Sequence, residues 1–426
     1  MARENSPLLE IERLEITSAE EEINEIFGTF LSPKFELVSY GGLISDARGD
    51  YTTTSDSIED YSHLGPFTKI DLTVIQPFYS FGKYGTAMNA GKNNLEMKTS
   101  MLRETSDNLG FEVTKAYLGI IAGLDGSQTG NELLERYEEL LERIDELQQE
   151  PDSDIDASYL LEAKALFFDI KSQASKPTIN KDQAQLYLAG LLNLEQGVTV
   201  VTSEIETPEL NPVTDLVPSL NDFFHKHSPV IQSLDSGLKA LKEKAALEKK
   251  KSYPDLFVAI GAGYGVAPGR DKQTNPFIAD DYNYKKIGAV LGLKWNFNYH
   301  VNNAKERKAF ISYQKIVQKK KLLLLQREGM IKKFHNEALR NQNLLHAATK
   351  SLKSAKTWLR LESENLDLGI GDVKRLVKAY QAYYQLKGNE IETRYHYLLS
   401  LAQLAKTTGD LDLFLLWIQN DKVQLN

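Results

Sequence analysis

The sequence predicts a mainly α-helical fold with a β-barrel portion, built from two copies of one structural unit. Three observations predict it. The sequence repeats itself at a spacing of about 220 residues, which indicates a duplicated architecture. Two long stretches without proline carry apolar residues at heptad spacing, as coiled coils do. Four short segments alternate apolar side chains with polar or small ones, which is the two-residue period of β-strands.

Proline marks the repeat. Pro7 and Pro229 each open a helical pattern, and about 25 residues later Pro33 and Pro254 each introduce a strand pattern. Alignment of the two halves predicts a first repeat, a linking segment and a second repeat, over residues 1–193, 194–219 and 220–426.

Long helices are expected where proline is absent. None of the 13 prolines lies between Phe78 and Glu150 or after Pro276. An interior proline costs a helix about 3 kcal/mol, so these stretches are free to be helical. The sequence predicts a long and a shorter helix in each repeat: about 82–148 and 156–193, then about 301–366 and 372–408. Five glycines predict a kink or a break in the first long helix: Gly110, Gly119, Gly123, Gly126 and Gly130.

Strands are expected at about 35–44, 67–79, 254–265 and 285–298. In the second of them Ile70 and Leu72 share one face, whereas Lys69 and Asp71 share the other. Roughly ten residues with aromatics at the ends is typical of strands in a transmembrane β-barrel. The aromatic residues expected at a membrane interface are Phe78, Tyr79, Tyr253, Trp295 and Phe297. Polar tips close the two hairpins, at 45–65 and 266–283.

The same alternation also fits a half-buried sheet in a soluble protein. Four strands are too few to close a barrel, and an open sheet edge is not tolerated in lipid. The barrel interpretation therefore requires several copies of the chain. The alternative is a soluble coiled-coil scaffold or interaction protein whose hairpins pack on themselves.

Composition excludes several functions. The net charge of −9, without a basic stripe, argues against nucleic acid as a partner. The chain has no cysteine, which excludes disulfides, thiolate metal sites and cysteine nucleophiles. The glycine-rich run 261–265 lacks the Lys-Ser/Thr of a phosphate-binding loop. No apolar run reaches the roughly 18 residues of a membrane-spanning helix. We therefore expect no enzyme activity, no cofactor and no metal.

Several stretches together resemble the TolC-type outer membrane factors. The run 74–83 is similar to that family's junction between strand and helix, and 227–231 followed by 253–256 is similar to its helix leading into a Pro-x-Leu strand. The turn at 366–373 is similar to its helical hairpin tip, and 186–200 to the segment between its repeats. The resemblance covers nearly the whole chain through the order and spacing of these stretches.

The resemblance implies a homotrimer in which four strands per protomer close a twelve-stranded barrel in the outer membrane. The helices would continue the barrel as a tunnel across the periplasm. The implied function is the exit duct of a tripartite efflux pump or a type I secretion system, a passive conduit from periplasm to exterior. The implied partners are outer membrane lipid, a periplasmic adaptor protein and an inner-membrane transporter. Family members also carry a signal peptide and a longer first helix, so we expect this sequence to begin inside the mature fold.

The predicted aperture differs from that of many relatives, which carry two aspartates just after the turn of the second repeat. Arg375 and Lys378 occupy those positions here, and Lys374 adds a third cation. The tip of the first repeat supplies carboxylates at Asp152, Asp154, Asp156 and Glu162. We hypothesise that these charges pair across the hairpins and hold the aperture shut. The alternative is that they are solvated tip charges, each contributing about 0–1 kcal/mol.

Overall fold

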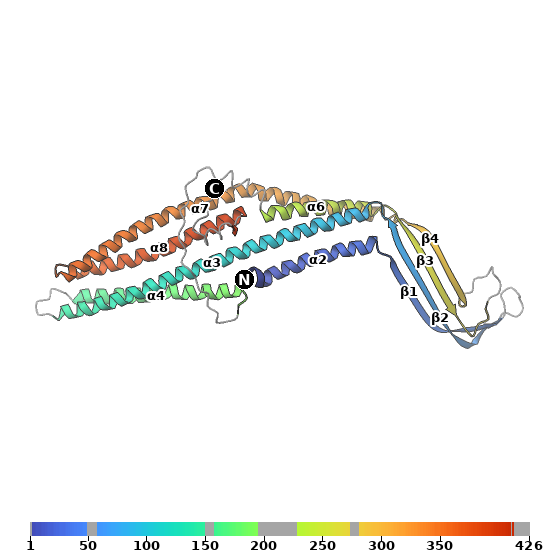
Figure 1. The fold of residues 1–426 in the computed structure, drawn as a ribbon, viewed down its shortest axis with the longest axis horizontal. Coiled ribbons are helices and arrows are strands. Elements are labelled where there is room, and N and C mark those ends of the chain that lie inside the picture. Colours follow the sequence, from blue (N-terminus) through green and yellow to red (C-terminus); the bar gives the residue numbers. More distant parts are fainter. Residues whose placement is uncertain are drawn as a thin grey trace. The chain divides into compact units, whose positions relative to one another are not determined.

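The computed structural model describes residues 2–48, 58–149, 157–194, 228–272, 281–409 and 411–412 (Figure 1). The chain divides into two compact units. The strand-bearing unit comprises Ile16–Met97 and Leu234–Gln318, and the helical unit comprises Met1–Glu15, Lys98–Ser233 and Lys319–Asn426.

The strand-bearing unit contains one antiparallel sheet of four strands in the order β1-β2-β3-β4. The strands are β1 Lys34–Arg48, β2 Ile58–Tyr79, β3 Asp255–Val266 and β4 Tyr284–Lys294. Each repeat contributes one hairpin, and β2 joins the hairpins by pairing with β3 from Thr68↔Val266 to Tyr79↔Leu256. The register shifts between Pro77 and Tyr79, and this bulge accommodates Pro77, which has no backbone N–H to donate to the neighbouring strand. This arrangement confirms the predicted fold class for the protomer, mainly helical with four strands.

The ends of the strands correct two details of the prediction. The first polar tip, expected at 45–65, is paired at its base, because the β1–β2 ladder continues to Arg48↔Ile58 after a register shift at Ser45/Asp46. β4, expected to reach residue 298, ends at Lys294. Beyond it the Trp295 indole donates from Nε1 to the carbonyl oxygen of Ser252 at 2.9 Å, which draws the chain out of the sheet.

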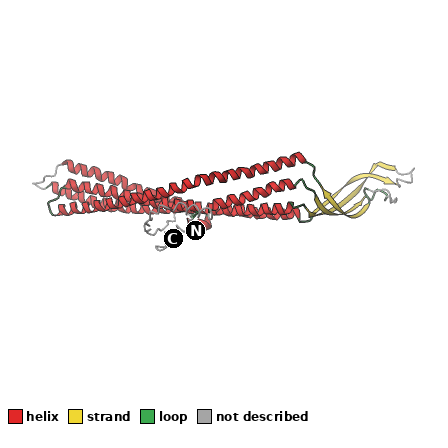
Figure 2. Cartoon of the chain, turned by 90° about the horizontal axis from the view of Figure 1, so that it is seen from above, coloured by secondary structure: helices red, strands yellow, loops and turns green. Residues whose placement is uncertain are grey.

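The helices account for most of the remaining described residues. They are α1 Ala2–Asn5, α2 Pro7–Phe30, α3 Lys83–Gln148, α4 Ala157–Leu191, α6 Pro229–Lys250, α7 Tyr299–Asp367 and α8 Val373–Thr408. Within the helical unit α4 runs back along α3, and α8 runs back along α7, as Figures 1 and 2 both show. Pro7 and Pro229 occupy the first position of their helices, where the missing N–H costs nothing.

The glycines of α3 do not break it, so the expected break is absent from this helix. The helix is continuous from Lys83 to Gln148. Gly123 and Gly126 instead face α4, where a Cβ atom at Gly126 would stand 2.8 Å from Cβ of Pro177 and one at Gly123 would stand 2.9 Å from its carbonyl oxygen. These glycines therefore admit the Pro177 turn of α4 close to α3, and packing offsets their low helix propensity.

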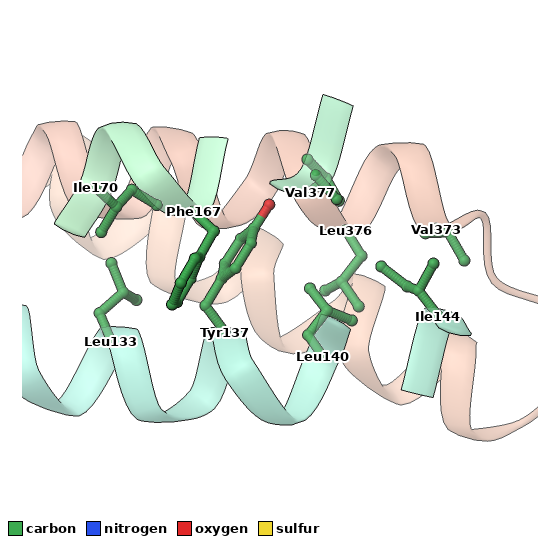
Figure 3. Packing of buried hydrophobic residues seen from close by; sticks show 10 residues of the cluster. Leu133, Tyr137, Leu140, Ile144, Phe167, Ile170, Val373, Leu376 and Val377 are labelled. Carbon is green, nitrogen blue, oxygen red and sulfur yellow. The ribbon is translucent and has the colours of Figure 1, made fainter. Parts of the chain in front are cut away.

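The main core of the helical unit lies where α3, α4 and α8 meet (Figure 3). On α3 and α8, heptad spacing predicts six of its buried residues: Leu133, Tyr137, Leu140, Ile144, Val373 and Val377. The heptads did not include the other buried residues of the cluster: Ala163, Phe167, Ile170 and Leu376. The Tyr137 ring stacks on Phe167 with centroids 6.1 Å apart and meets the Tyr380 ring edge-on at 5.5 Å. Aromatic packing of this kind fixes the three helices in one register.

Candidate functional site

One face of the sheet is apolar and exposed. Residues paired across the strands share a face, so Leu37, Leu72 and Ala262 lie in one row with Ile287. Leu37 is 67% exposed and Ile287 84%. The same face carries further exposed large apolar residues: Phe35, Ile70, Ile260, Leu291 and Leu293. A contiguous apolar surface of this kind marks contact with a membrane or another protein.

The opposite face of the sheet is polar and held by a charged network. Lys286 on β4 forms an ion pair with Asp71 on β2, with Nζ and Oδ1 2.9 Å apart. The Tyr284 hydroxyl donates to the same carboxylate, at 3.0 Å from Oδ2. The ion pair between Asp71 and Lys286 spans β3 at Gly263, where a Cβ atom would stand 2.4 Å from Asp71 Oδ1. Small residues on β3 thus leave room for charged side chains on this face.

A second cluster, of aromatic rings around Lys69, lies at the loop end of the polar face. The Lys69 ammonium lies 4.1 Å from the Tyr282 ring centroid and 5.8 Å from that of Tyr40. Phe67 meets both rings edge-on. Neither cluster was predictable from the sequence, because each joins residues of separate hairpins that meet only once the strand register is known.

All five aromatic residues predicted for a membrane interface lie at the helix-proximal end of the sheet. Trp295 and Phe297 stack with centroids 4.9 Å apart. Phe78 and Tyr79 end β2, and Tyr253 comes just before β3. All five are exposed, Phe297 the most at 75%. A band of exposed aromatic rings beside an apolar strand surface has the composition of an interfacial girdle.

A buried lysine fastens the helices to the sheet below this band. Lys83, at the start of α3, donates to the carbonyl oxygen of Tyr253 at 2.8 Å and pairs with Asp255 at 2.8 Å. Its side chain is only 6% exposed. Because Lys83 belongs to the first repeat and Asp255 to the second, the contact joins the two hairpins at one junction. No periodic pattern in the sequence indicates this contact.

The predicted aperture residues lie at the turn between α7 and α8. Gly369, with φ +74, allows α7 to end, and the Asp372 carboxylate caps α8 by accepting from the backbone N–H of Lys374 at 2.9 Å. Arg375 and Lys378 are exposed, and Lys374 is half-buried. Arg375 Nε lies 3.9 Å from Asp372 Oδ2 on its own helix.

The carboxylates expected to face these cations are only partly described. Asp152, Asp154 and Asp156 lie outside the described residues. Glu162 is exposed on α4, above the core that α4 shares with α3 and α8. The structure therefore leaves the predicted pairing across the hairpins as a prediction.

An ion network that the sequence did not predict links α8 to α3 within the helical unit. Arg394 donates to Asp125 on α3 at 2.5 Å and lies 3.6 Å from Glu390 on its own helix. Glu390 also pairs with Lys387 at 3.1 Å. In the sequence Arg394 occupies a heptad position on α8, where an apolar residue is usual. Its partner on α3 explains how a cation occupies that position.

None of the helices that the structure describes combines the length and apolarity needed to cross a membrane. In the part of the chain that the structure describes, His, Asp and Glu form no group of three that could hold a metal ion.

No protein-family model matches the chain, and a search of curated proteins finds no match. Solved structures do match. The structure of CusC, described in connection with folding and transmembrane channel formation, aligns with a TM-score of 0.76 at 14% identity, covering 96% of this chain and 90% of that one. The Campylobacter jejuni outer membrane channel CmeC aligns with a TM-score of 0.71 at 16% identity, over 96% and 84%.

The open state of the Neisseria gonorrhoeae outer membrane channel MtrE aligns with a TM-score of 0.73 at 14% identity, covering 96% of this chain and 88% of that one. Each alignment spans the helices and the sheet together, since it takes in nearly the whole chain. The chain therefore has the protomer fold of the TolC-type outer membrane factors, as the sequence resemblance predicted.

Proposed function

We propose that three copies of this chain form a channel through the bacterial outer membrane, a passive conduit that continues into the periplasm. The observation that carries the proposal is the sheet with one exposed apolar face, one polar face and two edge strands. In lipid such a sheet must close, because unpaired backbone groups at an edge each cost several kcal/mol. Three copies of four strands close a twelve-stranded barrel, with the apolar face toward lipid.

The strand lengths support a membrane crossing. β3 has 12 residues and β4 has 11. About 9–11 residues suffice for a tilted transmembrane strand. The aromatic band at the helix-proximal end then marks one membrane interface, and the polar face with Asp71 and Lys286 lines the lumen. The alternative of a soluble scaffold would need the apolar face covered, whereas Ile287 and Leu291 are 84% and 72% exposed.

The same proposal assigns the partners. A passive duct holds no energy source, so transport needs an inner-membrane transporter and a periplasmic adaptor protein that joins it to the helical tips. Both a tripartite efflux pump and a type I secretion system meet this description. The exposed Leu368 and Ile370 at the turn between α7 and α8 would be available for such a partner.

We further propose that Arg375 and Lys378, with Lys374 beside them, form cationic rings at the periplasmic aperture, facing Asp154, Asp156 and Glu162 of the other hairpin. The test is single-channel recording in planar bilayers. Wild type should favour anions, and Arg375→Asp with Lys378→Asp should shift the reversal potential toward cation selectivity. Lys332→Asp, on an exposed position of α7 away from the turn, serves as the control. Unchanged selectivity in the double variant would refute the lining role.

A further inference from the structure

A coiled-coil seam on α7 is exposed within the strand-bearing unit. Five residues spaced alternately by three and four are all exposed: Val301, Ala304, Lys308, Ile311 and Lys315. Val301 and Ile311 are 53% and 52% exposed. Apolar positions at this spacing are where one helix receives the side chains of another. Here the seam is basic as well, because it carries Lys308 and Lys315.

In the same unit α2 presents the opposite charge. One side of the helix packs on α3, where Ile23 and Ile26 lie against Gly91 and the Phe30 ring lies 6.4 Å from that of Tyr84. Glu21 and Glu25 are exposed and, at this helical spacing, lie on the side of α2 away from α3. The segment 16–30 contains no lysine or arginine.

The sheet order places these two helices at opposite edges. α2 ends at Phe30, just before the edge strand β1 begins at Lys34. α7 begins at Tyr299, just after the edge strand β4 ends at Lys294. When β1 of one copy pairs with β4 of the next, the helices attached to those strands lie side by side and antiparallel.

We propose that α2 of one copy docks on the α7 seam of the next copy, with Glu21 facing Lys308 in the seam and Glu25 facing Lys305 beside it. The proposal rests on the trimeric channel proposed above. Glu25 and Lys305 both lie about one and a half turns from the end of their helix nearest the sheet, and Glu21 and Lys308 both lie about two and a half turns from it. All four side chains are exposed. Complementary charge favours pairing of β1 of one copy with β4 of the next, and like charges oppose pairing of β1 with β1 or of β4 with β4.

The test uses full-length protein in detergent. The acidic variant is Glu21→Lys with Glu25→Lys, the basic variant is Lys305→Glu with Lys308→Glu, and a third variant combines all four changes. Light scattering over a dilution series gives the protein concentration at which trimers are half dissociated. We expect each two-site variant to raise that concentration about tenfold or more at low salt. The increase should be smaller at about 1 M salt, where the Debye length is about 3 Å. The combined variant should dissociate at a concentration close to that of wild type.

The matched control is Lys239→Glu with Lys244→Glu on α6, which should leave trimers unchanged. α6 precedes β3, which is paired on both sides within the chain. Far-ultraviolet circular dichroism checks that each dissociated variant stays helical, and recovery in the combined variant excludes misfolding. Trimers indifferent to both reversals, or a combined variant weaker than either, would overturn the docking alone. A monomeric wild-type protein would contradict the proposed channel itself.

Discussion

Among the described buried residues of the core where α3, α4 and α8 meet, Tyr137 alone carries a polar side-chain group. The side chain is fully buried, and its hydroxyl oxygen, visible in Figure 3, finds no hydrogen-bond partner among the described residues. Burial also raises the pKa of Tyr137 well above its ordinary value, so the group stays neutral. A buried hydroxyl without a partner costs about 1–3 kcal/mol.

Tyr137→Phe should therefore raise the free energy of unfolding by about 1 kcal/mol, since it keeps the ring stacked on Phe167 and removes the unpaired hydroxyl. Tyr137→Ala is the matched variant and should lower it by about 3–5 kcal/mol, because it leaves a cavity. Thermal unfolding in detergent measures both. A destabilised phenylalanine variant would show that the hydroxyl makes a stabilising contact.

A half-buried carboxyl on α3 makes stability depend on pH. Burial, and then the nearby Glu12 carboxylate, raise the pKa of Glu104, although Lys319 and Lys406 oppose the shift. The folded state then binds the proton more tightly than the unfolded state. Stability should rise as pH falls from neutrality through the raised pKa, and level off below the ordinary value near 4.

Glu104→Gln should remove this contribution, because a neutral amide occupies the same volume without a charge to desolvate. We expect higher stability than wild type at pH 7 and a smaller difference at pH 4.5. Melting temperatures across that range check it, with the exposed and ion-paired Glu328→Gln as control. A variant whose pH profile parallels that of wild type would contradict the role of Glu104.

At the scale of elements, the glycines of α3 lower its helix propensity but allow α4 to pack closely against it. Gly126→Ala would place a Cβ atom 2.8 Å from Cβ of Pro177, so the helices must separate. We expect a loss of about 1–3 kcal/mol. Gly329→Ala on α7 is the matched control, because a Cβ there meets open space, and it should add about 0.5–1 kcal/mol. Equal effects at both sites, read from unfolding midpoints, would rule out the close approach.

The elements also show where sequence patterns stop being informative. Heptads predict that Leu133, Tyr137 and Ile144 are core residues, because helix period and burial coincide there. The residues of β1 after Ser45 escaped prediction, since a ladder of backbone hydrogen bonds needs no apolar alternation. β4 was predicted too long because Trp295 and Phe297 continue the alternation after the chain has left the sheet.

The candidate site was predictable where it depends on local sequence period, and unpredictable where it depends on pairing between strands. The alternation of apolar and polar residues along each strand predicts the apolar face and the aromatic band, because both follow from the two-residue period of a single strand. The Asp71–Lys286 pair and the Lys83–Asp255 junction each join residues from different repeats, so they required the register of the strands. The family resemblance suggested Arg375 and Lys378 as aperture residues by their position after a turn. The structure adds that both are exposed, close to the Asp372 cap of α8.

At the scale of the whole molecule, the protomer is incomplete by itself. Its sheet has two edge strands, β1 and β4, and one exposed apolar face. The proposed trimer would satisfy both, because it pairs the edges and leaves the apolar face for lipid. The predicted duplication fits this proposal, since each predicted repeat supplies one hairpin of the sheet and one helical hairpin.

The most direct test of the central claim is the mass and conductance of the purified full-length protein. We predict that it needs detergent for extraction, that light scattering gives a protein mass of three times the 48.0 kDa protomer, and that the purified particle opens ion-conducting pores in planar bilayers. A buffer-soluble monomer that leaves bilayers sealed would contradict the channel and favour a coiled-coil scaffold.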